Sequence, residues 1–125
     1  MQTKYVFTIF FCGCVWLGTF CPTGVLAEEG TTTFAAIIPL SGNGAEHGLW
    51  IKRGLELARD NLRAQSQSAP VLVFEDSQGQ NTLAISALRK VSSTHDIAAV
   101  FSWGSGVALA LSPIVNQARI VQMGV

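Results

Sequence analysis

Four short apolar runs alternate along the chain with longer stretches in which apolar residues recur every three or four positions. The runs are residues 34–38, 71–74, 97–101 and 120–123. Short continuous apolar runs are typical of strands buried on both faces of a parallel sheet. The stretches between them predict helices over residues 51–62, 82–91 and 105–118. This alternation predicts an α/β fold, a doubly wound parallel sheet with right-handed crossovers and helices on both faces.

One face of the first predicted helix is apolar and consists of Ile51, Leu55, Ala58 and Leu62. Gly54 weakens this helix slightly, and we interpret it as a position where the helix packs closely on the sheet. Pro113 lies inside the third predicted helix. It should kink or interrupt that helix, because proline lacks the backbone N–H that a helix interior needs.

The first 27 residues read as a secretory signal peptide. Lys4 supplies a positive charge, and an almost uninterrupted apolar run follows from Tyr5 to Phe20. A proline and a glycine then break the run before small residues that a signal peptidase accepts, so we expect cleavage after Ala27. The alternative is an uncleaved anchor, but the run is shorter than the roughly 20 residues that span a bilayer. We therefore expect a periplasmic or extracellular protein.

All three cysteines lie within this leader, so residues 28–125 have no disulfide or thiol chemistry. Cys21 is an alternative site for lipid attachment, although the bulky Phe20 stands where such a site usually has a small residue. The formal net charge is zero, which provides no long-range attraction to nucleic acid or to an anionic membrane. We interpret residues 28–125 as one modest domain with no nucleic-acid partner.

Ligands of such sheets bind at the carboxyl ends of the strands, so the loops that follow the strands are the candidate site. After the first strand, residues 39–48 read PLSGNGAEHG, and the three glycines let the backbone approach a ligand closely. Ser41 offers a hydrogen bond, and the helix N-terminus that follows favours an anionic group. His47 either simply begins that helix or lines a ligand cleft with its ring.

The loop after the third strand, residues 102–106, reads SWGSG. Ser105 is placed to be the N-cap of the third helix, whose free N–H groups, together with the serine hydroxyl, would hold a carboxylate. The alternative for Ser105 is an ordinary cap with no ligand. Trp103 either covers an apolar part of a ligand or packs in the core.

A dinucleotide site fits the sequence poorly. Gly42, Gly44 and Gly48 have one residue too many before the last glycine for the usual fingerprint. Glu75 and Asp76 end the second strand, where a ribose-binding acid would stand, but they lie about 30 residues on, and roughly 20 is usual. We therefore expect no cofactor.

Metal and catalytic sites fit no better. His47 and His95 are expected at opposite ends of the sheet, which disfavours a histidine metal site. The acids, Asp76 and Asp96 among them, are expected to be solvated or turn-forming rather than paired. The tripeptide at residues 104–106 lacks the wider glycine frame of a nucleophile elbow. We expect no metal and no enzyme activity.

Four segments carry a resemblance to a known family. They are the run IPLSGNGAEHG at residues 38–48, GLELA at 54–58, the strand end EDS at 75–77 and the alanine-containing helix that follows. Together they resemble the branched-chain amino-acid binding proteins of ABC transporters, which are type I periplasmic binding proteins. The resemblance extends from about Phe34 to Val125.

The resemblance implies two doubly wound lobes that close on a ligand, with residues 28–125 as a partial, truncated first lobe. It implies a solute-binding protein that passes an amino acid, amide, urea or small carboxylate to the membrane subunits of a transporter. Ser105, with the nearby backbone of Gly104 and Gly106, falls where family members hold the carboxylate or ammonium group of the ligand. His47 falls where the family usually has an aromatic residue against the ligand.

Two departures from the family pattern affect these expectations. Gly79 and Gln80 stand where an acidic residue and a proline are common, which changes the turn. His47 replaces the common aromatic residue, so strict specificity for leucine, isoleucine and valine is not expected. The alternative function is the ligand-sensing domain of a receptor or regulator with the same fold. An uncleaved leader with a transmembrane or kinase segment downstream would favour that alternative.

Overall fold

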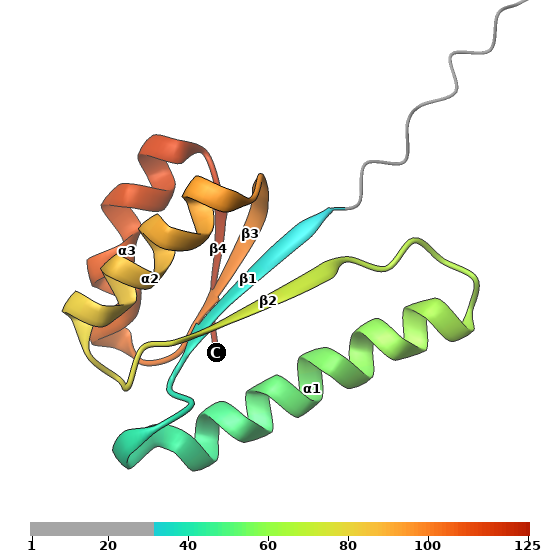
Figure 1. Cartoon of the computed structure of the whole chain (residues 1–125), viewed down its shortest axis with the longest axis horizontal. Helices are drawn as coiled ribbons and strands as arrows, with labels where there is room; N and C mark the ends of the chain where they lie inside the picture. The colour runs from blue at the N-terminus through green and yellow to red at the C-terminus, as the bar shows by residue number, and fades with distance from the viewer. Residues whose placement is uncertain (1–31) are drawn as a thin grey trace, which may run out of the picture.

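The computed structural model describes residues 32–125, which form four strands and three helices (Figure 1). The predicted signal peptide and its cleavage site lie outside the described residues. In chain order the elements are β1 (Thr33–Ile38), the short 3₁₀ turn η1 (Gly42–Gly44), α1 (Ala45–Ala64), β2 (Val71–Asp76), α2 (Asn81–Thr94), β3 (Ile97–Ser102), α3 (Ser105–Ala118) and β4 (Val121–Gly124). This is the alternation expected from the apolar pattern.

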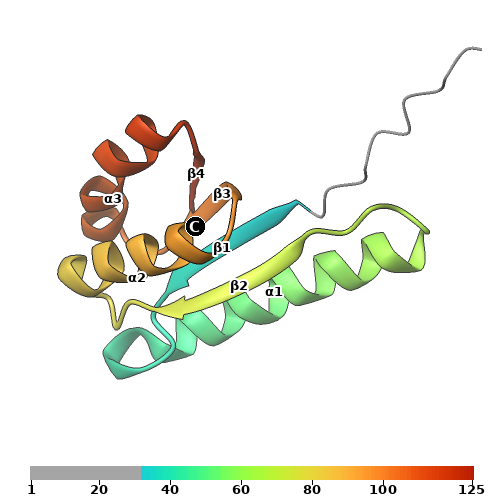
Figure 2. The ribbon, with the colours of Figure 1, turned by 45° about the horizontal axis from the view of Figure 1, so that its top comes forward.

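All four strands are parallel, in the order β2-β1-β3-β4. β1 pairs with β2 from Thr33 opposite Val71 to Ile38 opposite Asp76. The chain leaves β1 toward β2 and then returns past β1 to form β3, so the direction of winding reverses at β1. With right-handed crossovers, this reversal puts α1 on one face and α2 and α3 on the other, as Figures 1 and 2 show. The predicted doubly wound parallel sheet is confirmed.

The face covered by α2 and α3 holds the main apolar core. Along β1 the core side chains alternate, whereas the two from β3, Ile97 and Val100, are three positions apart because the register shifts at the start of the β1–β3 pairing. In all, the core side chains come from these two strands and from one side of each helix. They are Ala35, Ile37, Ala84, Ala87, Leu88, Val91, Ile97, Val100, Val107, Leu111 and Val115. Leu88, Val100 and Leu111 are completely shielded from solvent. This core fixes the two helices whose N-termini lie at the carboxyl edge of the sheet.

A buried polar contact joins β4 to this face. The side-chain amide of Gln122 donates to the hydroxyl of Ser102 at 3.2 Å and to the carbonyl of Ala108 at 3.0 Å. Ser102 is fully buried, so its hydroxyl needs a partner inside the protein. The contact links β3, α3 and β4 at the end of the sheet.

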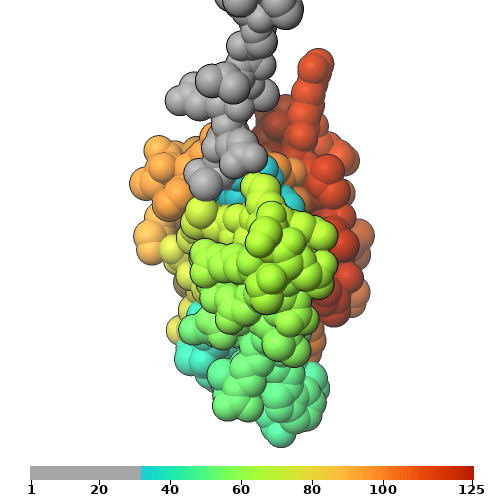
Figure 3. All heavy atoms as spheres, turned by 90° about the vertical axis from the view of Figure 1, so that its right-hand side faces the viewer, coloured from blue at the N-terminus to red at the C-terminus, as the bar shows by residue number. Residues whose placement is uncertain are grey.

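The opposite face is only partly covered, by α1, which lies toward the viewer in Figure 3. The rings of Phe34 and Phe101 meet edge to face there, with centroids 6.1 Å apart. An apolar groove of about 110 Å³ lies between them and α1. It is lined by Phe34, Leu55, Ala58, Arg59, Leu62, Pro70, Leu72 and Phe101. Three residues of the predicted apolar face of the first helix therefore do turn toward the sheet.

The expected close packing at Gly54 and the expected interruption at Pro113 are both wrong. Gly54 does not pack on the sheet, because a β-carbon at this position would have no atom within 4 Å. Pro113 does not interrupt α3, which is continuous from Ser105 to Ala118. Pro113 and Leu109 are both exposed, so water can satisfy the Leu109 carbonyl, which has no N–H donor from the proline. Within residues 32–125, no helix is long and apolar enough to cross a membrane.

The close approach of helix to sheet occurs instead at Gly48. A β-carbon at Gly48 would lie 1.7 Å from the carbonyl oxygen of Pro39 and 2.6 Å from its carbonyl carbon. Only glycine therefore lets the first turn of α1 rest against the end of β1. This contact sets where the first loop lies at the carboxyl edge.

The two glycines of α1 should respond oppositely to alanine. Gly54→Ala should raise the free energy of unfolding by roughly 0.5–1 kcal/mol, because it removes backbone freedom at an open helical position. Gly48→Ala should lower it by at least about 1–3 kcal/mol, because the methyl group meets backbone atoms that must shift. Urea-induced unfolding followed by circular dichroism measures both, and equal effects would contradict the contact at Gly48.

Candidate functional site

Two loops at the carboxyl edge of the sheet meet through aromatic rings. The ring of His47, in the first turn of α1, lies 5.4 Å from that of Trp50 and 5.3 Å from that of Trp103, between centroids. Trp103 belongs to the loop after β3. His47 and Trp50 are exposed and Trp103 is half-buried. These three residues, the aromatic cluster, give the edge an apolar surface that is open to solvent.

The position of Trp103 depends on small residues in the neighbouring loops. A β-carbon at Gly44 would lie 3.1 Å from Cζ3 of Trp103 and 2.9 Å from Cγ of Pro39. A β-carbon at Gly79 would lie 3.9 Å from the same Cζ3 atom. The indole therefore rests on the loops after β1 and β2, and the part of it that remains exposed adjoins His47.

Ser105 is the first residue of α3 and not its N-cap, so that expectation is wrong. The N-cap is Gly104, whose φ of +87° is a conformation that glycine adopts readily and serine does not. No side chain caps the helix, and Gly104, Ser105 and Gly106 are all exposed. The first-turn N–H groups of α3 have no carbonyl partners within the helix, and the positive end of its dipole favours an anionic group beside the Ser105 hydroxyl.

Ser41 is tied to β2 through the carboxylate of Asp76. Its hydroxyl donates to Oδ2 of Asp76 at 2.5 Å. The backbone N–H groups of Leu40, Ser41 and Gln78 donate to Oδ1 at 2.8, 3.3 and 2.9 Å. Because Asp76 pairs with Ile38 at the ends of β2 and β1, one side chain holds the loops that follow both strands.

The pKa of Asp76 reflects this set of hydrogen bonds. Partial burial alone would raise the pKa of the carboxyl, but the hydrogen bonds from Ser41, Gln78 and Leu40 outweigh burial and hold the pKa below 3.8. A carboxylate that accepts several hydrogen bonds is stabilised in its charged form. Asp76 is therefore an anion at neutral pH.

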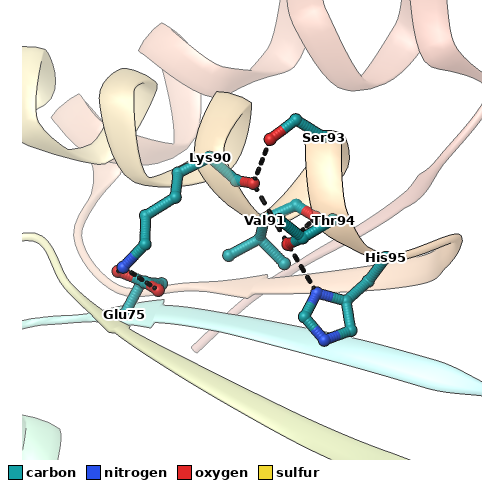
Figure 4. Close-up of polar contacts among 6 residues, drawn as sticks. All are labelled: Glu75, Lys90, Val91, Ser93, Thr94 and His95. Carbon is teal, nitrogen blue, oxygen red and sulfur yellow. Dashed lines mark hydrogen bonds and ion pairs between the residues drawn. The ribbon is translucent and has the colours of Figure 1, made fainter.

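Other polar residues form separate contacts. Glu75 pairs with Lys90 of α2 at 2.8 Å, and Nδ1 of His95 lies 2.8 Å from Oγ1 of Thr94 at the end of α2 (Figure 4). His95 precedes β3 and His47 follows β1, so the two histidines lie at opposite ends of the sheet, as expected. Within the described part of the chain, no three His, Cys, Asp or Glu side chains are grouped so that they could hold a metal ion.

The structure thus brings together His47 and Trp103, ties Ser41 to Asp76, and leaves Ser105 exposed at the start of α3.

Two residues of this edge are not among those expected from sequence. Trp50 stands three positions after His47 in α1, a spacing that puts both side chains on one face of the helix. Asp76 makes the expected turn contact with Gln78 and also the unexpected bonds to the first loop. Its position at the end of a strand adjacent to β1 is the signal that could have revealed them.

Comparison with known proteins places this fold. No protein-family model matches the sequence, and no curated protein is significantly similar to it. Solved structures do match, three binding proteins among them. A "possible leucine/isoleucine/valine-binding protein" from Rhodopirellula baltica SH 1 is 24% identical, with a TM-score of 0.67 over 71% of this chain and 25% of that chain. A substrate-binding periplasmic protein from Ralstonia solanacearum is 21% identical, with a TM-score of 0.69 over 74% and 28%.

The third, an ABC transporter substrate-binding protein from Sphaerobacter thermophilus, is 30% identical, with a TM-score of 0.64 over 74% of this chain and 26% of that chain. The fold is that of a lobe of the type I periplasmic binding proteins, and the resemblance expected from the sequence is confirmed. The chain spans about a quarter of the length of these solved structures. Their names describe binding proteins, and none describes an enzyme.

The lowered pKa of Asp76 predicts a pH-dependent contribution to stability. The folded pKa lies below the unfolded value of 3.8, so the contribution is complete above the unfolded pKa and is lost as the pH falls through the folded pKa. Asp76→Asn should therefore lower the free energy of unfolding by a constant amount above about pH 5, and the difference from wild type should shrink at lower pH. Urea unfolding at a series of pH values measures this difference. A difference that stays constant down to the lowest pH would contradict it.

Proposed function

We propose that the chain is part of an extracytoplasmic solute-binding protein, which delivers a small polar solute to the membrane subunits of an ABC transporter. The observation that carries the proposal is the open edge of a type I lobe, where an aromatic cluster lies at the carboxyl ends of the same strands as the uncapped N-terminus of α3. Ligands of open α/β sheets bind at this edge. No catalytic step is part of the proposal.

In this proposal the edge forms one wall of a ligand cleft. Ser105, with the backbone N–H groups near Gly104 and Gly106, holds a carboxylate or other acceptor group of the solute. His47 and Trp103 cover its apolar part, and Ser41 supplies a further polar contact. The opposite wall would come from a second lobe, as in the two-lobed family that the sequence resembles.

The solute is proposed to be an amino acid, amide, urea or small carboxylate. The name of the Rhodopirellula protein, which mentions leucine, isoleucine and valine, favours an amino acid among these. The aromatic cluster offers flat π-surfaces, which suit aromatic and amide groups as well as aliphatic ones. The site needs no cofactor or metal for this role.

The location proposed for the protein follows from the leader. We propose that residues 1–27 direct export, that cleavage follows Ala27, and that residues 28–125 belong to a ligand-binding lobe in the periplasm or outside the cell. The names of the neighbours support export, since the Ralstonia protein is called periplasmic. Mass spectrometry of the secreted protein tests the new N-terminus, which should be Glu28.

A fluorescence titration of the mature full-length protein tests the function. Trp50 and Trp103 lie in the aromatic cluster and should report a solute that enters the cleft. A saturable change with one class among amino acids, amides, urea and small carboxylates would support the proposal. Trp50→Phe and Trp103→Phe variants assign the signal to each ring. No response to any class would favour a ligand-sensing receptor domain, or a solute outside these classes.

Ser105→Ala should weaken binding of a carboxylate solute roughly tenfold or more, because it removes a hydrogen bond to a charged group. Ser92→Ala is the matched control, since Ser92 is also exposed but lies near the far end of α2. Isothermal titration calorimetry measures both affinities. Equal affinities of the two variants would remove Ser105 from the site.

A further inference from the structure

The carboxylate of Asp76 dictates the direction of the hydrogen bond to Ser41. The Asp76 carboxylate is an acceptor only, so the proton between the two side chains belongs to the Ser41 hydroxyl. A serine hydroxyl has one proton and two lone pairs. With its proton given to Asp76, the exposed Ser41 oxygen can only accept hydrogen bonds from other groups.

The other carboxylate oxygen fixes which way the Asp76 side chain faces. Oδ1 accepts three backbone N–H groups, from Leu40, Ser41 and Gln78. None of these donors can be turned around, because backbone N–H groups donate only. Oδ2 is therefore held toward the Ser41 hydroxyl, at the start of the loop that leads to His47. The hydrogen bonds that lower the pKa of Asp76 also keep it charged across the neutral range.

We propose that Asp76 is a positioning residue that makes Ser41 an obligate acceptor, so the site selects solutes that carry a hydrogen-bond donor. The inference rests on the proposed function, because it assigns a role to Ser41 within that cleft. The donor can be an ammonium, an amide N–H or a hydroxyl group. This polarity is opposite to that at the start of α3, where the available groups are donors.

Selection follows from the cost of leaving the acceptor without a partner. A solute with a donor replaces the water at the Ser41 oxygen, and the negative charge of Asp76 behind it favours a cationic donor. A solute of similar shape without the donor displaces that water and leaves the Ser41 oxygen without a hydrogen bond. Sites built on such hydrogen bonds discriminate strongly against analogues that lack the bonding group.

Asp76→Asn should reverse the direction of the hydrogen bond between residue 76 and Ser41, with little change in the shape of the side chain. The three backbone N–H groups require an oxygen at the position of Oδ1, so the amide NH₂ must occupy the position of Oδ2. It then donates to Ser41, whose proton turns outward. The preference is the ratio of the affinity for a solute with a donor to the affinity for its analogue without the donor. This ratio should fall about tenfold or more in the variant. A purely structural disturbance of the loop would weaken both solutes and leave their ratio unchanged.

The first solute pair is L-leucine and 4-methylpentanoate, which has the same carbon skeleton without the amino group. Calorimetry on the mature full-length protein should show that wild type prefers L-leucine and that Asp76→Asn and Ser41→Ala lose most of this preference. Ser41→Ala covers the case in which Asp76→Asn fails to fold, since it leaves the three backbone bonds intact. Asp96→Asn, a change at an exposed acid before β3, should keep the preference.

A second measurement needs no solute. Carbon-13 NMR of the Asp76 carboxyl as a function of pH should give a higher pKa in Ser41→Ala than in wild type, because one donated hydrogen bond is lost. An unchanged pKa would overturn the assigned direction of the bond. The same titration in Ser105→Ala should match wild type.

The outcomes separate the two proposals. If wild type binds L-leucine and the two variants keep its preference over 4-methylpentanoate, the role of Asp76 is overturned and the binding function stands. If wild type binds the two solutes equally, the role of Asp76 is again overturned and the binding function again stands. If wild type binds no solute of any class, the proposed function fails, while the NMR result still decides whether Ser41 donates to Asp76.

Discussion

The parallel pairing of β1 on both its sides is the constraint on which the rest of the structure depends. A strand in this position has no free edge, and Ala35, Ala36, Ile37 and Ile38 are all at most 1% exposed. Parallel neighbours also require each connection to cross a face of the sheet and return to the same starting edge. The chain therefore delivers the loops after β1, β2 and β3 to one edge, and whatever these loops carry must act together.

The same constraint leaves some positions at this edge tightly packed and others exposed to solvent. Gly48 and Gly44 stand where the first loop passes against Pro39 and Trp103, and neither position has room for a side chain. Asp76 ends its strand level with Ile38, so its carboxylate meets the N–H groups of a loop that has just left the sheet. Beyond these fixed contacts His47 and Ser105 remain exposed, because nothing in residues 32–125 lies over them.

Much of the fold could be predicted from apolar runs such as residues 34–38. A strand with one face in water would show polar residues at alternate positions, and this run has none. The start of α1 could not be predicted, because its first turn, from Ala45, is polar and the apolar period begins only at Ile51. His47 and Trp103 could be placed at the edge from their loops alone. The role of Asp76 depends on which strand lies beside β1, a long-range pairing that no local pattern specifies. Ser105 was displaced from the N-cap by a single positive φ at Gly104.

The partly covered face of the sheet has a consequence for how the protein reaches its folded state. Within residues 32–125, β4 pairs only with β3, and its Val121 and Met123 are 61% and 47% exposed. Unpaired backbone groups beside exposed apolar side chains recruit other strands. An intermediate in which only this part had folded would be prone to aggregate and would be a target for chaperones. The yield of soluble protein should then depend more on how quickly this surface is covered than on how stable the α2–α3 core is.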